Sequence, residues 1–333
     1  MSIPVIAFFN NKGGVGKTSM VYHLAWMFSE RNLRVIAADL DPQSNLTAAF
    51  LDEDQIEQLM LPDEHSRTIF GAVEPLKHGT GDIAEPHVEI ITERLGLILG
   101  DMALSTFEDD LSEVWPKCLA GDPRAFRITT AFWRLVQKAG QQHGADVILF
   151  DLGPNLGAIN RAALIASDFV VIPLGPDLFS VQGLQNLGPA LRLWRDGWKK
   201  RLGENPPKDV QLPLGGIKPI GYVLLRHSVR LDRPVKAFER WIARMPSTYA
   251  ESVLAQEQSD PKVTTDTDPN CIAKLKDYRS LMPLAQEACK PMFFLKPADG
   301  ALGAHTYAVT DAYRDFLHVA IKIAANAGIK PLS

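Results

Sequence analysis

The sequence predicts an α/β fold in which a mostly parallel β-sheet carries helices on both of its faces. Three observations lead to this prediction. Short apolar runs of Val, Ile, Leu and Phe recur along the 333 residues without polar alternation, as in strands that are buried on both sides. Longer segments with apolar residues near helical spacing lie between these runs. A glycine-rich stretch joins the first run to the first of these segments.

The predicted strands and helices alternate in chain order. Strands are expected at 5–9, 35–38, 95–99, 147–150, 169–174 and 220–225. The helices expected between them include 20–30, 129–141 and 184–202. Such a strand–helix–strand repetition implies parallel strands joined by right-handed crossovers. We predict a single domain over residues 1–333, with irregular insertions near 52–94, 199–219 and 228–300.

Composition excludes several classes of protein. Hydrophobic residues make up 46% and charged residues 22% of the chain, as in ordinary globular proteins. The net charge of −4 excludes a protein that is basic all over, so contact with nucleic acid requires a local patch. Cys118, Cys271 and Cys289 fit neither a disulfide framework nor a paired-cysteine metal site. No apolar run approaches the ~20 residues of a membrane span, and no signal-peptide pattern is evident, so we expect a cytoplasmic protein.

Residues 10–18, NNKGGVGKT, carry the strongest functional signal in the sequence. They follow the first predicted strand directly and precede a helix that opens near Lys17, which is the context that a phosphate-binding loop needs. A glycine-rich turn without a ligand is the alternative, but it does not require a Lys-Thr pair at the start of the helix.

Each residue type in this loop has a chemical reason. The three glycines permit backbone angles and a close approach that a side chain would block. Lys17 can reach the β- and γ-phosphates, and the Thr18 hydroxyl can ligate Mg²⁺. The residues expected to bind the nucleotide are Lys12, Gly13, Gly14, Val15, Gly16, Lys17, Thr18 and Ser19.

The loop departs from the general pattern GxxxxGK[ST] because Asn11 occupies the position of the first glycine. A second lysine, Lys12, stands beside it. A lysine this early in the loop lies too close to its own backbone to add much to phosphate binding within the same subunit. It could instead project across a subunit interface to a partner's nucleotide.

The segment KGGVGKT, residues 12–18, resembles the deviant Walker A motif of the ParA/MinD family of P-loop ATPases. The chain is similar in particular to ParA-type (Soj-like) partition ATPases. This resemblance implies a P-loop NTPase fold with ATP and Mg²⁺ as cofactors. It also implies a homodimer that forms on ATP binding, in which Lys12 contacts the phosphates of the other subunit.

Two carboxylates end the second predicted strand, within residues 34–45. Asp39 and Asp41 are two residues apart, so both face the same side of a strand at the carboxyl edge of the sheet. One can hold magnesium-bound water while the other orients the attacking water, although a simple strand-end turn gives the same pattern. The stretch looks like the family's DxDPQxN switch I. This resemblance implies that Asp41 positions water and that Asp39 holds water bound to the magnesium ion.

A third carboxylate, Asp151, ends the strand that begins after Asp146. A hydrophobic strand that ends in Asp is typical of a Walker B motif, which places one anion near the metal. The stretch is similar to the family's Walker B and switch II segment. Gly153 stands where the family usually has the first of two prolines, which predicts more backbone freedom in switch II. The resemblance fades after residue 225, and no base-contacting residue is identified.

Two basic clusters could contact partners. Residues 192–201 contain five basic residues and one acid, and this run could meet DNA phosphates without reading sequence. A solvated helix face whose two tryptophans pack inward explains the run equally well. The second cluster comprises Arg226, Arg230, Arg233 and Lys236. Residues 316–325 are expected to pack against the sheet, and no membrane contact is expected.

Together these features predict a Mg²⁺-dependent ATPase switch of the ParA type, for DNA partition or cargo positioning. It would bind nonspecific DNA and a ParB-like or adaptor protein. A ParA-like ATPase of another DNA-linked or defence system is an alternative. An electron-transfer ATPase like the nitrogenase iron protein would need paired cysteines. A nucleotide-binding module that does not hydrolyse ATP would keep Lys17 but would not need Asp41.

Overall fold

The computed structural model describes residues 2–60, 65–225, 235–257, 260, 262–278, 281–301, 303–330 and 332. The second basic cluster predicted from the sequence lies outside these residues, apart from the backbone of Lys236.

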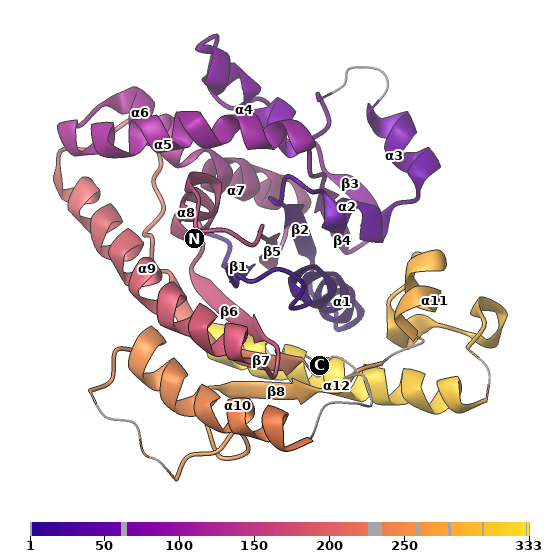
Figure 1. The fold of residues 1–333 in the computed structure, drawn as a ribbon. Helices are drawn as coiled ribbons and strands as arrows, with labels where there is room; N and C mark the ends of the chain where they lie inside the picture. Colours follow the sequence, from indigo (N-terminus) through magenta and orange to yellow (C-terminus); the bar gives the residue numbers. More distant parts are fainter. Residues whose placement is uncertain are drawn as a thin grey trace.

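The described chain forms one eight-stranded sheet with the strand order β3-β4-β2-β5-β1-β6-β7-β8 (Figure 1). All neighbouring strands pair in parallel except β3 and β4, which are antiparallel. The strands are β1 (Val5–Phe8), β2 (Val35–Asp39), β3 (Glu89–Thr92), β4 (Leu95–Ile98), β5 (Val147–Asp151), β6 (Phe169–Leu174), β7 (Lys218–Leu225) and β8 (Cys271–Leu275). Every residue of β1, β2, β4 and β5 is buried, which confirms the prediction that these apolar runs are strands covered on both faces.

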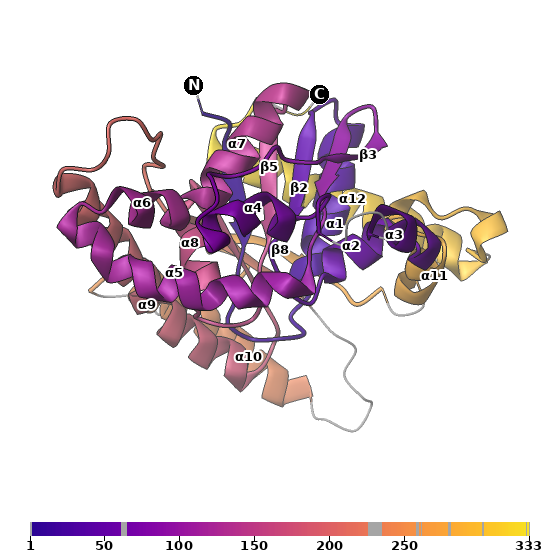
Figure 2. The same ribbon diagram turned by 90° about the horizontal axis from the view of Figure 1, so that it is seen from above.

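Helices cover both faces of the sheet, as the sequence predicts (Figures 1 and 2). One face packs against α1 (Lys17–Glu30), α2 (Asn45–Phe50), α3 (Glu53–Met60), α11 (Leu281–Glu287) and α12 (Ala304–Ala327). The other packs against α4 (Ile69–His78), α5 (Phe107–Lys117), α6 (Pro123–Thr129), α7 (Ala131–His143), α8 (Ala158–Ile165), α9 (Leu178–Gly203) and α10 (Val235–Thr248). Alternate residues of β1 serve the two cores, because Ile6 and Phe8 join the first and Ala7 the second.

The segments expected to be irregular contain regular elements. Helices α3 and α4 and strand β3 lie within 52–94, and β8 and α11 lie within 228–300. Short helical turns connect other elements: η1 (Met102–Thr106), η2 (Cys118–Ala120), η3 (Tyr249–Val253), η4 (Met292–Phe294) and η5 (Pro297–Asp299). The sequence pattern missed β3 because its residues are only partly buried or exposed, and β8 because Lys274 interrupts its apolar run at the edge of the sheet.

Helix α12 packs against the sheet, as expected for residues 316–325. Phe316, Val319, Ala320 and Ile323 are buried in the same core as β1 and β2. In the part of the chain that the structure describes, no helix combines the length and the apolar content needed to cross a bilayer.

Candidate functional site

The predicted phosphate loop connects β1 to α1 at the carboxyl edge of the sheet. Gly14 and Gly16 have φ angles of 70° and 79°, in the left-handed region that favours glycine. A Cβ added to Gly16 would also lie 2.7 Å from a methyl carbon of Leu225 on β7. No side chain caps the start of α1, so its first N–H groups are available to an anion.

Lys17 is folded back over this loop. Its Nζ donates to the backbone oxygen of Lys12 at 3.2 Å, and its side chain is buried. Burial lowers the pKa of Lys17, while the charges of Asp151 and Asp41 act in the opposite direction. The structure therefore brings together the loop, Lys17 and two of the carboxylates predicted from the sequence.

Asp39 and Asp151 occupy paired positions on the neighbouring strands β2 and β5. Asp39 is fully buried and accepts hydrogen bonds from the N–H and the hydroxyl of Thr47, at 2.8 and 2.9 Å. Burial raises the pKa of Asp39 to about 7, and the charge of Asp41 adds to this, although the hydrogen bonds from Thr47 oppose it. Asp39 thus holds the turn that follows β2, and its Oδ2 already accepts two hydrogen bonds from Thr47.

Asp151 has a different environment. It is fully buried, and among the described residues neither carboxylate oxygen has a hydrogen-bond partner. Burial, followed by the charge of Asp39, raises the pKa of Asp151 well above its usual value, and Thr18 and Lys17 act in the opposite direction. A buried carboxylate without partners is costly unless a cation compensates it.

These residues fit a magnesium ion. The oxygens of Thr18 and Asp151 are hard donors of the kind that Mg²⁺ binds, and Mg²⁺ usually takes one or two protein ligands beside substrate phosphates and water. Within the described residues there is no group of three or more His, Cys, Asp or Glu side chains that would cage a metal ion. A site completed by the substrate's phosphates agrees with both observations.

Asp41 lies against Gly153, in the segment after β5 at residues 152–157 that we call switch II for its resemblance to the family's. Its Oδ1 accepts a hydrogen bond from the N–H of Gln43 at 3.1 Å. A Cβ added to Gly153 would lie 3.2 Å from the same oxygen, so the glycine leaves room that a proline would occupy. The departure at Gly153 therefore has a local explanation in the position of Asp41.

Switch II is anchored in spite of that glycine. Glu108 of α5 accepts hydrogen bonds from the N–H groups of Ala158 and Ile159, at 2.5 and 2.8 Å, and so caps the helix that follows the switch. Asn160 donates to the backbone oxygens of Gly153 and Asn155, at 2.9 and 2.7 Å. The structure thus restrains a segment in which the sequence predicted extra freedom, through residues that the sequence analysis missed.

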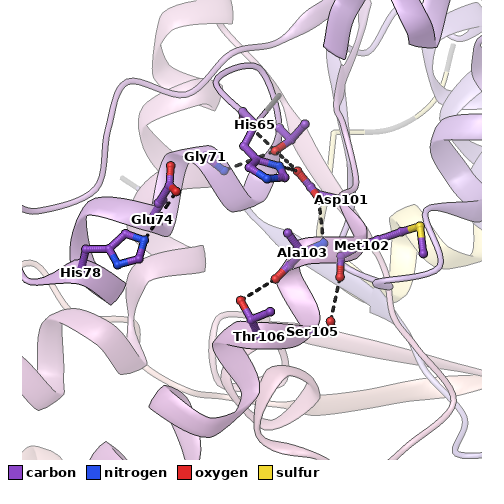
Figure 3. Close-up of polar contacts among 10 residues, drawn as sticks. His65, Gly71, Glu74, His78, Asp101, Met102, Ala103, Ser105 and Thr106 are labelled. Carbon is purple, nitrogen blue, oxygen red and sulfur yellow. Dashed lines mark hydrogen bonds and ion pairs between the residues drawn. The ribbon is translucent and has the colours of Figure 1, made fainter. Parts of the chain in front are cut away.

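A hydrogen-bond network around Asp101 follows the end of β4 (Figure 3). Asp101 accepts hydrogen bonds from the Thr68 hydroxyl and the N–H of Ala103, at 2.7 and 2.8 Å, and contacts His65 Nδ1 at 2.7 Å. The preceding residue, Gly100, donates its N–H to the Thr47 hydroxyl at 2.8 Å. The hydroxyl that binds Asp39 is therefore itself held by β4.

Lys12 does not turn toward the phosphate side of its own loop. Its Nζ forms an ion pair with Oδ2 of Asp177 at 2.5 Å and lies 5.8 Å from the ring centre of Phe179. Burial by itself would raise the pKa of Asp177, but hydrogen bonds from Lys12 and Ser180 hold that pKa below its usual value. The sequence analysis did not identify Asp177, which is 165 positions away along the chain.

The loop opens into a cavity of about 620 Å³. Its polar wall consists of the phosphate loop with Lys17, Thr18 and Asp41. Its opposite wall comes from the C-terminal third of the chain, which the sequence left without a role. That second wall includes Leu275, Tyr278, Met282, Ala285, Met292 and Phe316.

His23 joins the two walls. Met292 donates its N–H to Nε2 of His23 at 3.2 Å, and Nδ1 lies 2.7 Å from the backbone oxygen of Ser19. The ring stacks on Phe316 with 4.7 Å between ring centres. Burial lowers the pKa of His23 to about 4, so the ring is neutral near pH 7 and can accept the hydrogen bond at Nε2.

The basic run on α9 is not a continuous cationic surface. Both of its tryptophans are buried, which confirms the inward packing considered as an alternative. Arg192 donates to the backbone oxygen of Ser252, and Arg201 is buried. Lys199 and Lys200 remain exposed.

Trp115 of α5 accounts for the burial of Arg201. The guanidinium carbon of Arg201 lies 3.5 Å from the Trp115 ring centre, and that of Arg161 on α8 lies 4.7 Å away. Arg201 also donates from Nε to the backbone oxygen of Trp115 at 2.8 Å. Trp115 therefore connects the helix after switch II to the C-terminal end of α9.

Comparisons with known proteins identify the family of this chain. A family model described as an AAA domain matches residues 3–203, which is more than half of the chain. The chain belongs to this family, the ParA/MinD-like P-loop ATPases.

Two curated relatives illustrate the family. Protein IncC of Escherichia coli is 35% identical over 182 residues, which cover 54% of this chain and 43% of IncC. The chromosome-partitioning ATPase Soj of Thermus thermophilus is 29% identical over 199 residues, which cover 59% of this chain and 65% of Soj. The match thus spans less than half the length of IncC.

Solved structures share the fold along the whole chain. Protein DIP2308 of Corynebacterium diphtheriae aligns with a TM-score of 0.69 and 24% identity, and covers 97% of this chain and 98% of its own. The Cyanothece McdA(D38A)–ATP complex aligns with a TM-score of 0.61 and 17% identity, over 100% and 99% of the two chains.

Proposed function

We propose that this chain is a Mg²⁺-dependent ATPase switch that forms a homodimer around ATP and releases its partner after hydrolysis. One observation carries the enzymatic part: the fully buried carboxylate of Asp151, whose charge only Thr18 and Lys17 favour, lies near the end of a phosphate-binding loop. That arrangement is costly in the empty protein and is compensated when a cation and a polyphosphate bind.

The residues of the polar wall and the buried Asp151 beside them divide the chemistry between them. The N–H groups of the loop and Lys17 would hold the phosphates, and Thr18 and Asp151 would hold Mg²⁺. The metal neutralises charge on the phosphates during transfer. Asp41, on the cavity wall beside Gly153, would orient the attacking water. A module that does not hydrolyse ATP would need Asp41 only for the turn after β2, where its Oδ1 accepts from Gln43.

The apolar wall provides a place for the base. The side chains of Leu275, Tyr278 and Met282 line the cavity beyond the phosphate loop. Aromatic and apolar side chains with few polar groups are typical of sites that enclose flat ligands. We propose that this wall contacts adenine, a role that the sequence could not assign.

The biological role follows from the relatives. Soj is named as a chromosome-partitioning ATPase, and the McdA structure was solved with ATP. We therefore infer a cytoplasmic role in DNA partition or cargo positioning, with a ParB-like or adaptor protein as partner. Lys199 and Lys200 stay exposed and Arg195 stays partly exposed, so these three are the patch's remaining candidates for contact with DNA phosphates.

The test is phosphate release by wild-type protein and by Asp41→Ala, with and without duplex DNA. We expect Asp41→Ala to lower turnover about 100-fold while ATP binding persists, because a water-orienting group acts in the transition state. Equal turnover in both proteins, or background turnover in both, would refute the proposed enzymatic role.

A further inference from the structure

The start of α8 is held by a side chain from another helix. Gly157, the residue before α8, offers no capping side chain. Glu108 of α5 supplies the cap instead, because its two carboxylate oxygens accept from the N–H groups of Ala158 and Ile159. Glu108 is 50 positions away from Ala158 along the chain. This cap therefore joins two helices, whereas an ordinary cap stabilises only its own.

Gly157 leaves the space that the Glu108 carboxylate needs. A Cβ added to Gly157 would lie 2.5 Å from Oε1 of Glu108 and 2.8 Å from Oδ1 of Asn155. The backbone angles of Gly157, φ −80° and ψ −177°, are open to any residue. The close approach of these two oxygens, and not the backbone conformation, therefore explains the glycine.

Arg161 strengthens the same joint from the side of α8. Its guanidinium donates to the backbone oxygen of Leu111 at 3.1 Å, three residues after Glu108 on α5. Burial lowers the pKa of Arg161, and the charge of Glu108 opposes this effect. Hydrogen bonds thus run in both directions between α5 and α8, and the two charges stabilise each other.

Asn160 connects this joint to the backbone beside Asp41. Its side chain is only 1% exposed and lies in the first turn of α8, where it donates to the backbone oxygens of Gly153 and Asn155. Gly153 is the residue that lies against the Asp41 carboxylate. A shift of the start of α8 would therefore move the backbone that borders Asp41.

We propose that Glu108 is a positioning residue for hydrolysis, because it fixes the start of α8 and so keeps switch II against Asp41. This inference rests on the proposed function, since it assumes that Asp41 orients the attacking water. A displacement of about 1 Å at a reacting group can slow a reaction as much as 100-fold. The described residues that line the nucleotide cavity do not include Glu108, so ATP binding should not depend on it.

Two substitutions of Glu108 test this role. Glu108→Ala removes the cap, and we expect kcat to fall about tenfold while the Kd of the Mg²⁺–nucleotide complex stays within about twofold of wild type. Glu108→Gln keeps the length of the side chain and one acceptor oxygen, so its loss of kcat should be smaller, about threefold. Phosphate release at saturating ATP gives kcat, and calorimetry with AMPPNP and Mg²⁺ gives Kd. Both are measured at a temperature at which circular dichroism shows every variant to be folded.

Three further proteins complete the experiment. Gly157→Ala disturbs the joint from the other side, because its Cβ displaces the Glu108 carboxylate, and should give the same fall in kcat with unchanged Kd. It also replaces Glu108→Ala if that variant folds poorly. Glu113→Ala is the matched control on α5, since that carboxylate pairs with Lys117 at the surface, and should change neither quantity. In an Asp41→Ala background, Glu108→Ala should have no further effect on kcat.

The outcomes separate this inference from the proposed function. A wild-type protein without ATP turnover refutes the proposed function, and the inference fails with it. A wild type that hydrolyses ATP, with an unchanged kcat in the Glu108→Ala and Gly157→Ala variants, overturns the inference alone. Parallel losses of kcat and nucleotide affinity also overturn it, because Glu108 would then support the fold as a whole. A tenfold effect that persists in the Asp41→Ala background overturns it as well, since Glu108 would then act through another group.

Discussion

The two walls of the nucleotide cavity differ in chemistry and in how the sequence encodes them. The polar wall is built from short segments in which neighbouring residues act together, such as the loop before Lys17 and the turn after Asp39. The apolar wall is built from single residues on β8, α11, η4 and α12, brought together by packing. The comparison teaches that the phosphate end of the site can be read from motifs, whereas the base end depends on the tertiary fold.

The largest loss of activity is expected when Asp151, which is buried beneath the polar wall near Lys17, is changed. Asp151→Asn removes one of the two proposed magnesium ligands, so we expect Mg²⁺-dependent turnover to fall about 100-fold or more. Phosphate release at varied Mg²⁺ measures this, with Asp146→Asn at the far end of β5 as control. Turnover within threefold of wild type would count against the assignment.

Thermal stability should change in the opposite direction, so that replacing Asp151 stabilises the nucleotide-free protein. The pKa values of Asp39 and Asp151 are raised in the folded protein. The two carboxyl groups therefore contribute most to folding stability below pH ~4, and this contribution is lost as the pH rises to about 7 and above. We expect the Tm of the nucleotide-free protein to fall over this range. Asp151→Asn should weaken that fall and raise the Tm at pH 7.5 by roughly 5 °C. A lower Tm for the variant at pH 7.5 would contradict this account.

A change beside the apolar wall should have a smaller effect, and it should weaken only the binding of the base. His23→Phe keeps an aromatic ring against Phe316 but removes the contacts with Ser19 and Met292. We expect about fivefold weaker ATP binding, equivalent to the loss of about one hydrogen bond. Calorimetry with inorganic tripolyphosphate is the control, since this probe has no base and should bind both proteins equally. Equal losses for both ligands would show that His23 supports the phosphate end instead.

The smallest effect is expected at the contact between the switches. Gly153→Ala places a Cβ 3.2 Å from Asp41 Oδ1, so the carboxylate must shift by a few tenths of an ångström. We expect turnover to fall about threefold with unchanged ATP affinity, because only the water-orienting group moves. Gly203→Ala, where an added Cβ meets nothing within 4 Å, is the matched control. A turnover that Gly153→Ala leaves unchanged would show that Asp41 tolerates the shift.

Much of the fold could be predicted because its signals are local. The buried strands β1, β2 and β5 are continuous apolar runs, and β2 and β5 each end at a carboxylate of the site. The register of the sheet then places Asp39 beside Asp151, and this pairing could not be predicted from a local sequence pattern. The sequence identified both carboxylates but not the difference between them, because that difference arises from Thr47 and its support by Gly100.

The rest of the site depends on contacts between distant residues. Asp177 is 165 positions from Lys12, and Met292 is 269 positions from His23. Glu108 carries no motif and acquires its role only because α5 crosses the start of α8. An isolated Asp, Glu or His is common on any surface, so sequence alone cannot select these residues.

Helix α9 is fixed at both of its ends. Its first residue follows Asp177, the counter-ion of Lys12, and Arg201 in its last turn stacks on Trp115. Adding or removing a single residue between these points would rotate one end by about 100° relative to the other and shift it by ~1.5 Å. A change of length within α9 would therefore separate these two contacts, whereas an insertion in the loop after Gly203 would leave both in register.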